Sequence, residues 1–262
     1  MSLSLTSYTQ GTLCQGHTWT VIDEADLAEQ IALIALGLSH HVRKILAGTK
    51  LKKTATDIDI ANSAIRYLTV SGPNPWQRDG WIFQCISWIA ASQAAPNGVI
   101  AAPQMVHAQK GFDGMQLEID GATGKVSAAI IFEDKATEDA RTMVRDKVWP
   151  EFLRLEKGER MNEVTAQVVS LLQANGIQDP DEAIENILWK NVRRYRVSVT
   201  IDDKHNSSKG REDLFSGYEG IAADPISRRR AETICIPELR EWMQQIADKS
   251  ISAIRAKAVT NV

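Results

Sequence analysis

The chain has 262 residues, of which 44% are hydrophobic and 24% are charged, and its formal net charge is −3 at pH 7. This is ordinary globular composition, and the small net charge does not by itself indicate a polyanionic partner. Cys14, Cys85 and Cys235 lie far apart without a CxxC pair, which excludes a recognisable zinc or disulfide framework and indicates a reducing cytoplasm. The N-terminus lacks a signal-peptide pattern, and no apolar run approaches the roughly 20 residues that span a bilayer, so we expect no membrane association.

The first part of the chain, residues 1–70, is expected to be an added N-terminal helical region. Apolar residues at helical spacing predict its helices, and a Gly-Pro-Asn-Pro sequence ends it. In order, we expect this region to contain a short strand around His17–Ile22, a helix from Asp23 to Gly48 and a second helix through Ile65 and Leu68. A third helix, over Trp76–Ala94, is expected to follow the Gly-Pro-Asn-Pro sequence.

Residues 71–262 are expected to form an α/β core, with the whole chain making one compact domain. Pro150 predicts a kink near Trp149 in the helix that follows the third strand. The expected elements are strands Val99–Ala108, Phe112–Ile119 and Val126–Lys135, a helix from Thr137, helices Met161–Asn175 and Pro180–Arg193, a strand Tyr195–Ile201, a loop Asp202–Ile221, a strand Ala231–Ile236 and a helix Pro237–Val259.

The most informative stretch is residues 111–136, where two strand-like runs flank a Gly-rich turn. Side chains two positions apart in a strand share a face, so Glu133 and Lys135 project together. If the turn is centred on Ala122–Thr123, antiparallel pairing places Asp113 opposite Glu133 to within about one residue. We therefore expect two carboxylates and a lysine to meet at one end of a hairpin.

This cluster predicts a site for Mg²⁺ or Mn²⁺. Magnesium prefers oxygen ligands and keeps several waters, so one or two carboxylates are sufficient. Asp113 and Glu133 are the expected ligands, and the backbone carbonyl of Asp134 would add a third oxygen. Lys135 cannot bind a metal while protonated, but it can position a water and neutralise charge on a scissile phosphate. The residues therefore indicate phosphodiester hydrolysis.

A simpler interpretation is a surface hairpin in which Lys135 only pairs with Glu133. The apolar run Ala128–Phe132 argues against it, because such a run is typical of a strand buried on both faces.

With Asp113 as the isolated acid and Glu133 and Lys135 as an ExK element, the chain resembles the PD-(D/E)xK nuclease superfamily over about residues 76–201. The resemblance implies a restriction-endonuclease-like α/β/α sandwich with a mixed central sheet, and cleavage of DNA with Mg²⁺ or Mn²⁺. Phe112 stands where the family often has proline, a variable position.

Many members of that superfamily carry Glu or Gln on the helix before the first core strand. The matching catalytic candidate in this chain is Gln84, with Asp79 as an alternative on the same helix. The KGFDGM stretch and the long N-terminal region look like nucleases of bacterial anti-phage defence, such as the nuclease subunit of Hachiman-type systems. That likeness implies a partner helicase or ATPase, since the chain itself has no GxxxxGK[ST] loop.

Basic residues are concentrated in three segments, at 43–53, 190–196 and 228–230. The middle segment interleaves aromatic and cationic residues, which favours contacts with phosphates. Its candidate nucleic-acid-binding residues are Lys190, Arg193, Arg194 and Arg196. His107, six residues before Asp113, is a weaker candidate for which a structural role is favoured.

Three functions remain open at this stage. The leading one is a metal-dependent deoxyribonuclease in the cytoplasm, and a ribonuclease would use the same chemistry. The alternative from another class is a catalytically silent nucleic-acid-binding or assembly module that kept the nuclease fold.

Overall fold

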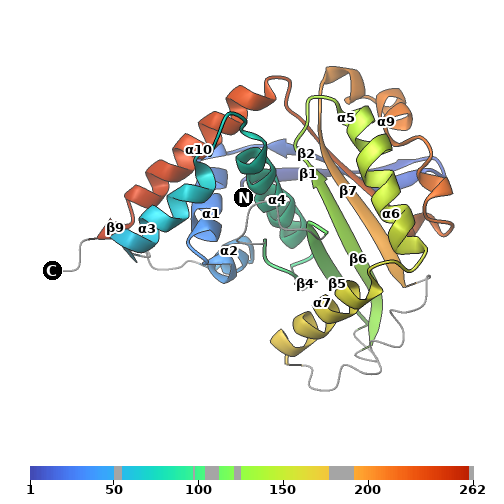
Figure 1. Cartoon of the computed structure of the whole chain (residues 1–262), viewed down its shortest axis with the longest axis horizontal. Coiled ribbons are helices and arrows are strands. Elements are labelled where there is room, and N and C mark those ends of the chain that lie inside the picture. The colour runs from blue at the N-terminus through green and yellow to red at the C-terminus, as the bar shows by residue number, and fades with distance from the viewer. Residues whose placement is uncertain (50–54, 97, 104–111, 121–124, 177–191, 260–262) are drawn as a thin grey trace.

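The computed structural model describes residues 1–49, 55–96, 98–103, 112–120, 125–176 and 192–259. In these residues a mixed seven-stranded sheet has the order β1-β2-β8-β7-β6-β5-β4 (Figure 1). Its strands are β1 (Leu3–Gln10), β2 (Cys14–Val21), β4 (Val99–Ile100), β5 (Gly114–Ile119), β6 (Val126–Lys135), β7 (Arg193–Ile201) and β8 (Arg229–Cys235). The neighbours β2, β8, β7 and β6 pair in parallel, whereas β1–β2, β6–β5 and β5–β4 pair antiparallel.

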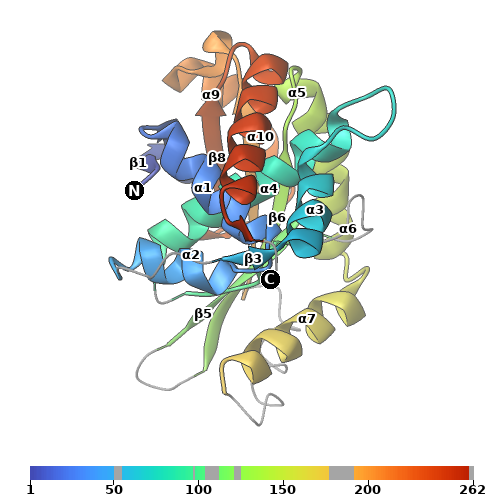
Figure 2. The same cartoon turned by 90° about the vertical axis from the view of Figure 1, so that its left-hand side faces the viewer.

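Helices cover both faces of this sheet, so the chain has an α/β fold (Figures 1 and 2). One face carries α1 (Glu24–Ala35), α2 (Ser39–Leu46), α3 (Ile58–Ile65), α4 (Trp76–Ala94) and α10 (Leu239–Arg255). The other carries α5 (Ala140–Met143), α6 (Trp149–Glu156), α7 (Met161–Ala174) and α9 (Ser208–Phe215). A small parallel pair joins β3 (Thr56–Asp57) to β9 (Ala258–Val259), and short 3₁₀ turns occupy Arg66–Leu68, Asp203–His205, Tyr218–Gly220 and Ile226–Arg228. No helix among the described residues is long and apolar enough to cross a membrane.

Strand β6 lies inside the sheet and is buried on both faces, as its apolar run predicts. Ala128, Ile130 and Phe132 pack into the core beneath α4, whereas Ala129 and Ile131 pack into the core beneath α5, α6 and α7. The same alternation assigns the charged residues that end the strand. Glu133 and Lys135 belong to the face of α6, and Asp134 belongs to the face of α4.

The N-terminal region differs from the expected helical region because it begins with a β-hairpin. Strands β1 and β2 pair in full register from Leu3–Val21 to Gln10–Cys14, and β2 also joins β8. The single helix expected from Asp23 to Gly48 is two helices, α1 and α2, separated at Gly37, whose positive φ of 76° ends a helix easily. The helical spacing of apolar residues continues from α1 into α2, so this pattern alone did not indicate the turn at Gly37.

The loop expected over Asp202–Ile221 is also wrong, because it contains α9. Ser207 caps this helix by accepting a hydrogen bond from the Gly210 N–H. Phe215 and Tyr218, in and just after the helix, are fully buried in the core on the α6 face. The segment is therefore part of the packed fold and not a surface loop.

Where the sequence predicts a kink, a π-helical turn over Val144–Val148 stands before Trp149 and Pro150, which begin α6. The strand expected over Val99–Ala108 is only two residues long among the described residues. Most of the helix expected over Pro180–Arg193, and the turn centre at Ala122–Thr123, lie outside the described residues; Arg193 itself begins β7.

Candidate active site

The β5–β6 hairpin brings Asp113 to Glu133, as the strand pattern predicts. Gly114 pairs with Phe132, and the Asp113 N–H donates to the Phe132 carbonyl at 3.0 Å. Asp113 therefore lies just before β5, opposite Glu133. The close pairing requires a glycine after the acid, since a Cβ on Gly114 would lie 2.9 Å from the Phe132 ring.

Four side chains meet at this end of the hairpin. The Lys135 Nζ lies 2.9 Å from Asp113 Oδ2 and 2.7 Å from Glu133 Oε2. The Gln84 amide of α4 donates to Asp113 Oδ1 at 2.6 Å, and the Asp134 backbone N–H donates to Asp113 Oδ2 at 2.8 Å. Both oxygens of Asp113 are thus fixed, one by α4 and the other by β6.

Of the two candidates on α4, the structure brings only Gln84 to the acid. Asp79 is fully buried and pairs with Arg78 at 2.7 Å and with Arg240 of α10 at 2.6 Å. This ion-pair network gives Asp79 a structural role in joining α4 to α10.

Burial shapes the charges of the site. Glu133 is 5% exposed, and the loss of water together with the charge of Asp113 raises the pKa of Glu133 to about 7, although Lys135 opposes this. Burial alone would lower the pKa of Lys135, but the charges of Glu133 and Asp113 raise it above its usual range. Lys135 therefore stays protonated at neutral pH and acts as a cation and hydrogen-bond donor.

The Asp134 side chain lies on the opposite face of β6, beneath α4. Its Oδ1 accepts a hydrogen bond from the Ser87 hydroxyl at 2.7 Å, and burial raises its pKa to about 6 against the lowering effect of Arg196. Ser87 also accepts from Arg196 Nη1 at 3.1 Å. Sequence reasoning missed Ser87, although its place three residues after Gln84 on a helix was a usable signal.

Asp113, Glu133 and the Asp134 carbonyl are the candidate oxygen ligands for a divalent cation at this end of the hairpin. In a β-strand the N–H and C=O of one residue point to the same side, so the Asp134 carbonyl faces β5 as its N–H does. This carbonyl therefore lies at the same end of the hairpin as the two carboxylates, which the Lys135 ammonium joins. No group of three or more His, Cys, Asp or Glu side chains suited to a metal occurs in the described part of the chain, but magnesium needs only one or two carboxylates.

Comparisons of the chain with protein-family models, curated proteins and solved structures find no match. The chemistry of the site is therefore inferred from its own residues.

The candidate nucleic-acid-binding residues do not form one exposed cluster. Arg193 is 2% exposed and donates to the Leu155 carbonyl, and Arg196 is 3% exposed, between the Trp19 and Phe132 rings. Arg194 is partly exposed and pairs with Glu118. We therefore retain only Arg194 of these three as a candidate phosphate contact, while Lys190 and His107 lie outside the described residues.

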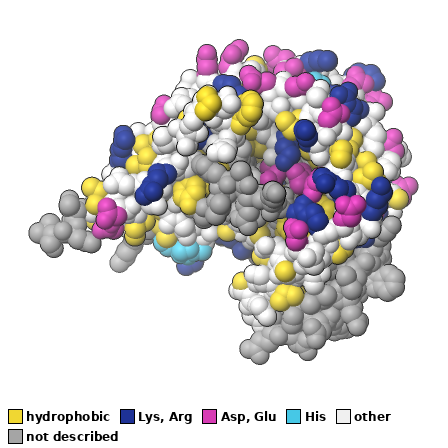
Figure 3. Space-filling model, viewed as in Figure 1, with side chains coloured by type: hydrophobic (Ala, Val, Ile, Leu, Met, Phe, Trp, Pro, Cys, Tyr) yellow, Lys and Arg dark blue, Asp and Glu magenta, His cyan; other side chains and the backbone are white. Residues whose placement is uncertain are grey.

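The last basic segment, 228–230, is also largely internal. Arg228 pairs with Glu156 and Arg229 with Asp224, and both arginines are buried. On the face seen in Figure 3, basic and acidic side chains are interspersed and form no broad field of one sign. Binding of a polyanion on this face would thus depend on individual contacts.

Proposed function

We propose that this protein is a metal-dependent nuclease that hydrolyses phosphodiester bonds in DNA. The observation that carries the proposal is the meeting of Asp113, Glu133 and Lys135 at the end of the β5–β6 hairpin, with Gln84 on the first of them. A lysine held by two carboxylates on the end of a buried strand is the arrangement that the ExK element implies.

The order of elements gives further support. Helix α4 precedes the antiparallel strands β4, β5 and β6, and α5, α6 and α7 then precede β7, which is parallel to β6. This order is the one implied by a restriction-endonuclease-like sandwich, with the acid at the second strand and the ExK element at the end of the third. We propose that fold for the core.

In the proposed site Asp113, Glu133 and the Asp134 carbonyl would hold Mg²⁺ or Mn²⁺. Such an ion supplies positive charge to the scissile phosphate and lowers the pKa of a bound water. Gln84 keeps Asp113 oriented, because its amide donates a hydrogen bond to one oxygen of the Asp113 carboxylate. Burial and the charge of Asp113 raise the pKa of Glu133. A bound cation would favour the ionised form of Glu133 and so oppose this effect.

Lys135 would contact the substrate or the attacking water and would not bind the metal ion. Its ammonium stays protonated, so it donates hydrogen bonds to the attacking water or to a phosphate oxygen and does not serve as a general base. Water attacks phosphorus and loses a proton to solvent, the bond from phosphorus to the leaving oxygen breaks, and the leaving oxygen takes up a proton from solvent. Lys135 stabilises the added negative charge during this step.

We propose DNA as the substrate and anti-phage defence with a helicase or ATPase partner as the setting. The support for both is the resemblance of the motif and of the KGFDGM stretch to defence nucleases. RNA is the competing substrate, and a substrate panel distinguishes the two.

The proposal is tested by incubating the purified chain with supercoiled, linear and single-stranded DNA and with RNA, in Mg²⁺, Mn²⁺ or EDTA. We expect cleavage of DNA with metal, no cleavage in EDTA, and a loss of about 100-fold or more for Lys135→Ala. Lys209→Ala is the matched control, because Lys209 is an exposed lysine of α9 whose ion pairs are with its own helix.

Two outcomes would contradict the proposal. Equal cleavage by Lys135→Ala and wild-type protein would show that Lys135 and the site around it do not carry out the reaction. Salt-sensitive binding of DNA without cleavage in either metal would instead support the silent binding module.

A further inference from the structure

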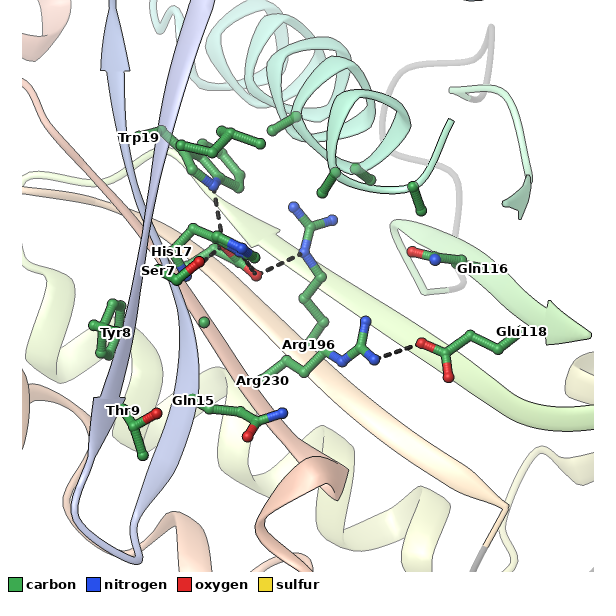
Figure 4. Close-up of a pocket in the computed structure, with 17 residues that line it drawn as sticks. Ser7, Tyr8, Thr9, Gln15, His17, Trp19, Gln116, Glu118, Arg196 and Arg230 are labelled. Carbon is green, nitrogen blue, oxygen red and sulfur yellow. Dashed lines mark hydrogen bonds and ion pairs between the residues drawn. The ribbon is translucent and has the colours of Figure 1, made fainter. Parts of the chain in front are cut away.

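A cavity of about 570 Å³ lies on the α4 face of the sheet (Figure 4). The last turns of α4 form one wall with Ala90, Ala91 and Ala94, and the opposite wall consists of side chains from β1, β2, β5, β7 and β8. Its volume lies within the roughly 300–1,000 Å³ of small-molecule sites. Because Arg196 pairs in register with Phe132 and faces α4, the cavity is on the opposite face from Glu133 and Lys135.

The two carboxylates that line the cavity, those of Glu118 and Glu232, already accept hydrogen bonds from neighbouring residues. Glu232 accepts from Trp19 Nε1 at 3.0 Å and from the His17 N–H at 2.9 Å, and Arg196 Nε lies 3.7 Å away. Glu118 accepts one bond from Arg230 and another from Arg194, each at 2.5 Å. Both glutamates are thus paired with arginines, and the cavity lining itself has two arginines, Arg196 and Arg230, and two glutamates.

The hydrogen-bonding capacity that remains consists mainly of donors. Arg230 uses one Nη to reach Glu118, and within the described residues its other N–H groups make no hydrogen bond. Gln116 is 5% exposed, and its amide also has no hydrogen-bond partner in the described part of the chain. In Figure 4 the Gln116 side chain points into the cavity. The Gln116 amide therefore keeps its donor and its acceptor available to a group that enters the cavity.

From this geometry we propose that the cavity binds a nucleoside monophosphate. The phosphate is held by Arg230, whose guanidinium is planar and presents paired donors. The base lies against the alanine wall of α4, where small side chains leave room for a flat ring, and its polar edge meets the Gln116 amide, which both donates and accepts. The inference goes beyond the proposed hydrolysis and does not depend on it.

The test is calorimetric titration of the full chain with adenosine, guanosine, cytidine and uridine 5′-monophosphates in EDTA. EDTA removes divalent cations, so binding at the catalytic carboxylates is suppressed. Inorganic phosphate and adenosine serve as partial ligands, and each is expected to bind more weakly than the best mononucleotide. A 5′-phosphorylated dinucleotide distinguishes a free nucleotide from the end of a strand.

Variants locate the binding. Arg230→Ala is expected to weaken binding about 10- to 100-fold, the effect of one lost charge-assisted contact. Ala94→Trp, at an exposed position on the cavity wall, is expected to abolish it by filling the space. Lys135→Ala and Lys209→Ala are expected to bind as the wild type does, and thermal melting confirms that each variant is folded.

Four results would overturn the proposal. The first is no binding of any mononucleotide at millimolar concentration, the second is equal affinity in wild type, Arg230→Ala and Ala94→Trp, and the third is binding that is lost only in Lys135→Ala. Phosphate that binds as tightly as every mononucleotide would also contradict it, because the base would then contribute nothing.

Discussion

Replacing Glu133 with glutamine is expected to change the pH dependence of stability in a defined direction. The pKa of Glu133 is raised from its ordinary value of 4.5 to about 7, mainly because the carboxylate is removed from water. Between these two values the native state binds more protons than the unfolded state. The stability contributed by this group therefore falls as the pH rises through that window. Glutamine resembles the protonated acid and does not titrate.

The magnitude follows from the pKa. At 1.36 kcal/mol for each pKa unit, the change from 4.5 to about 7 corresponds to about 3 kcal/mol. The free energy of unfolding of Glu133→Gln, measured relative to wild type, should thus increase by about 3 kcal/mol between pH 4.5 and pH 8. Asp134 titrates in both proteins, so its own contribution largely cancels in this difference.

The assay is urea unfolding followed by circular dichroism, in EDTA, at half-unit steps from pH 4.5 to pH 8. Glu118→Gln is the matched control, since Glu118 is a partly exposed carboxylate of the same hairpin whose partners are arginines. A difference between Glu133→Gln and wild type that is constant with pH, or that favours the wild type as the pH rises, would refute the reasoning.

Four further predictions test the site and the fold. Mg²⁺ at about 100 times its dissociation constant should stabilise the wild type at pH 8 by about 2.7 kcal/mol in thermal unfolding, and Glu133→Gln should lose most of this effect. Ser87→Ala should cost about 1–3 kcal/mol and slow DNA cleavage, since Asp134 loses its donor; a fully active and equally stable variant would contradict this. Gly16→Ala should cost about 3–5 kcal/mol in urea unfolding, because its Cβ would lie 1.7 Å from a backbone oxygen of β8. Gly80→Ala, with no atom within 4 Å of its Cβ inside α4, should instead gain about 0.5–1 kcal/mol.

The candidate site could be predicted from sequence because its geometry is local. Asp113, Glu133 and Lys135 belong to one hairpin, so strand alternation and antiparallel pairing are enough to bring them together. The helix Trp76–Ala94 was also predictable, and Gln84 followed from the resemblance. No local pattern indicated which of Gln84 and Asp79 faces the acid, since that depends on how α4 packs across the sheet.

The features that sequence reasoning missed depend on contacts between distant segments. Arg193 and Arg196 form part of a charged run, but their partners are the Leu155 carbonyl, Glu232 and aromatic rings far away in the chain. A cluster of cations is therefore no measure of exposure when each cation has a buried partner elsewhere. The strand expected around His17–Ile22 is confirmed as part of β2, but β1 was missed for a related reason, because it is largely polar and is held by pairing with β2, which in turn pairs with β8.

Helix α4 connects the proposed active site to the proposed nucleotide cavity. Gln84 orients Asp113, Ser87 holds Asp134 one turn later, and Ala94 ends the cavity wall. From Gln84 to Ala94 is about 15 Å along a helix, so a single element carries the groups of both sites. The Ser87 hydrogen bonds to Asp134 and Arg196 fix this helix against β6 and β7. A displacement of α4 large enough to alter the cavity would consequently alter the orientation of Asp113 as well.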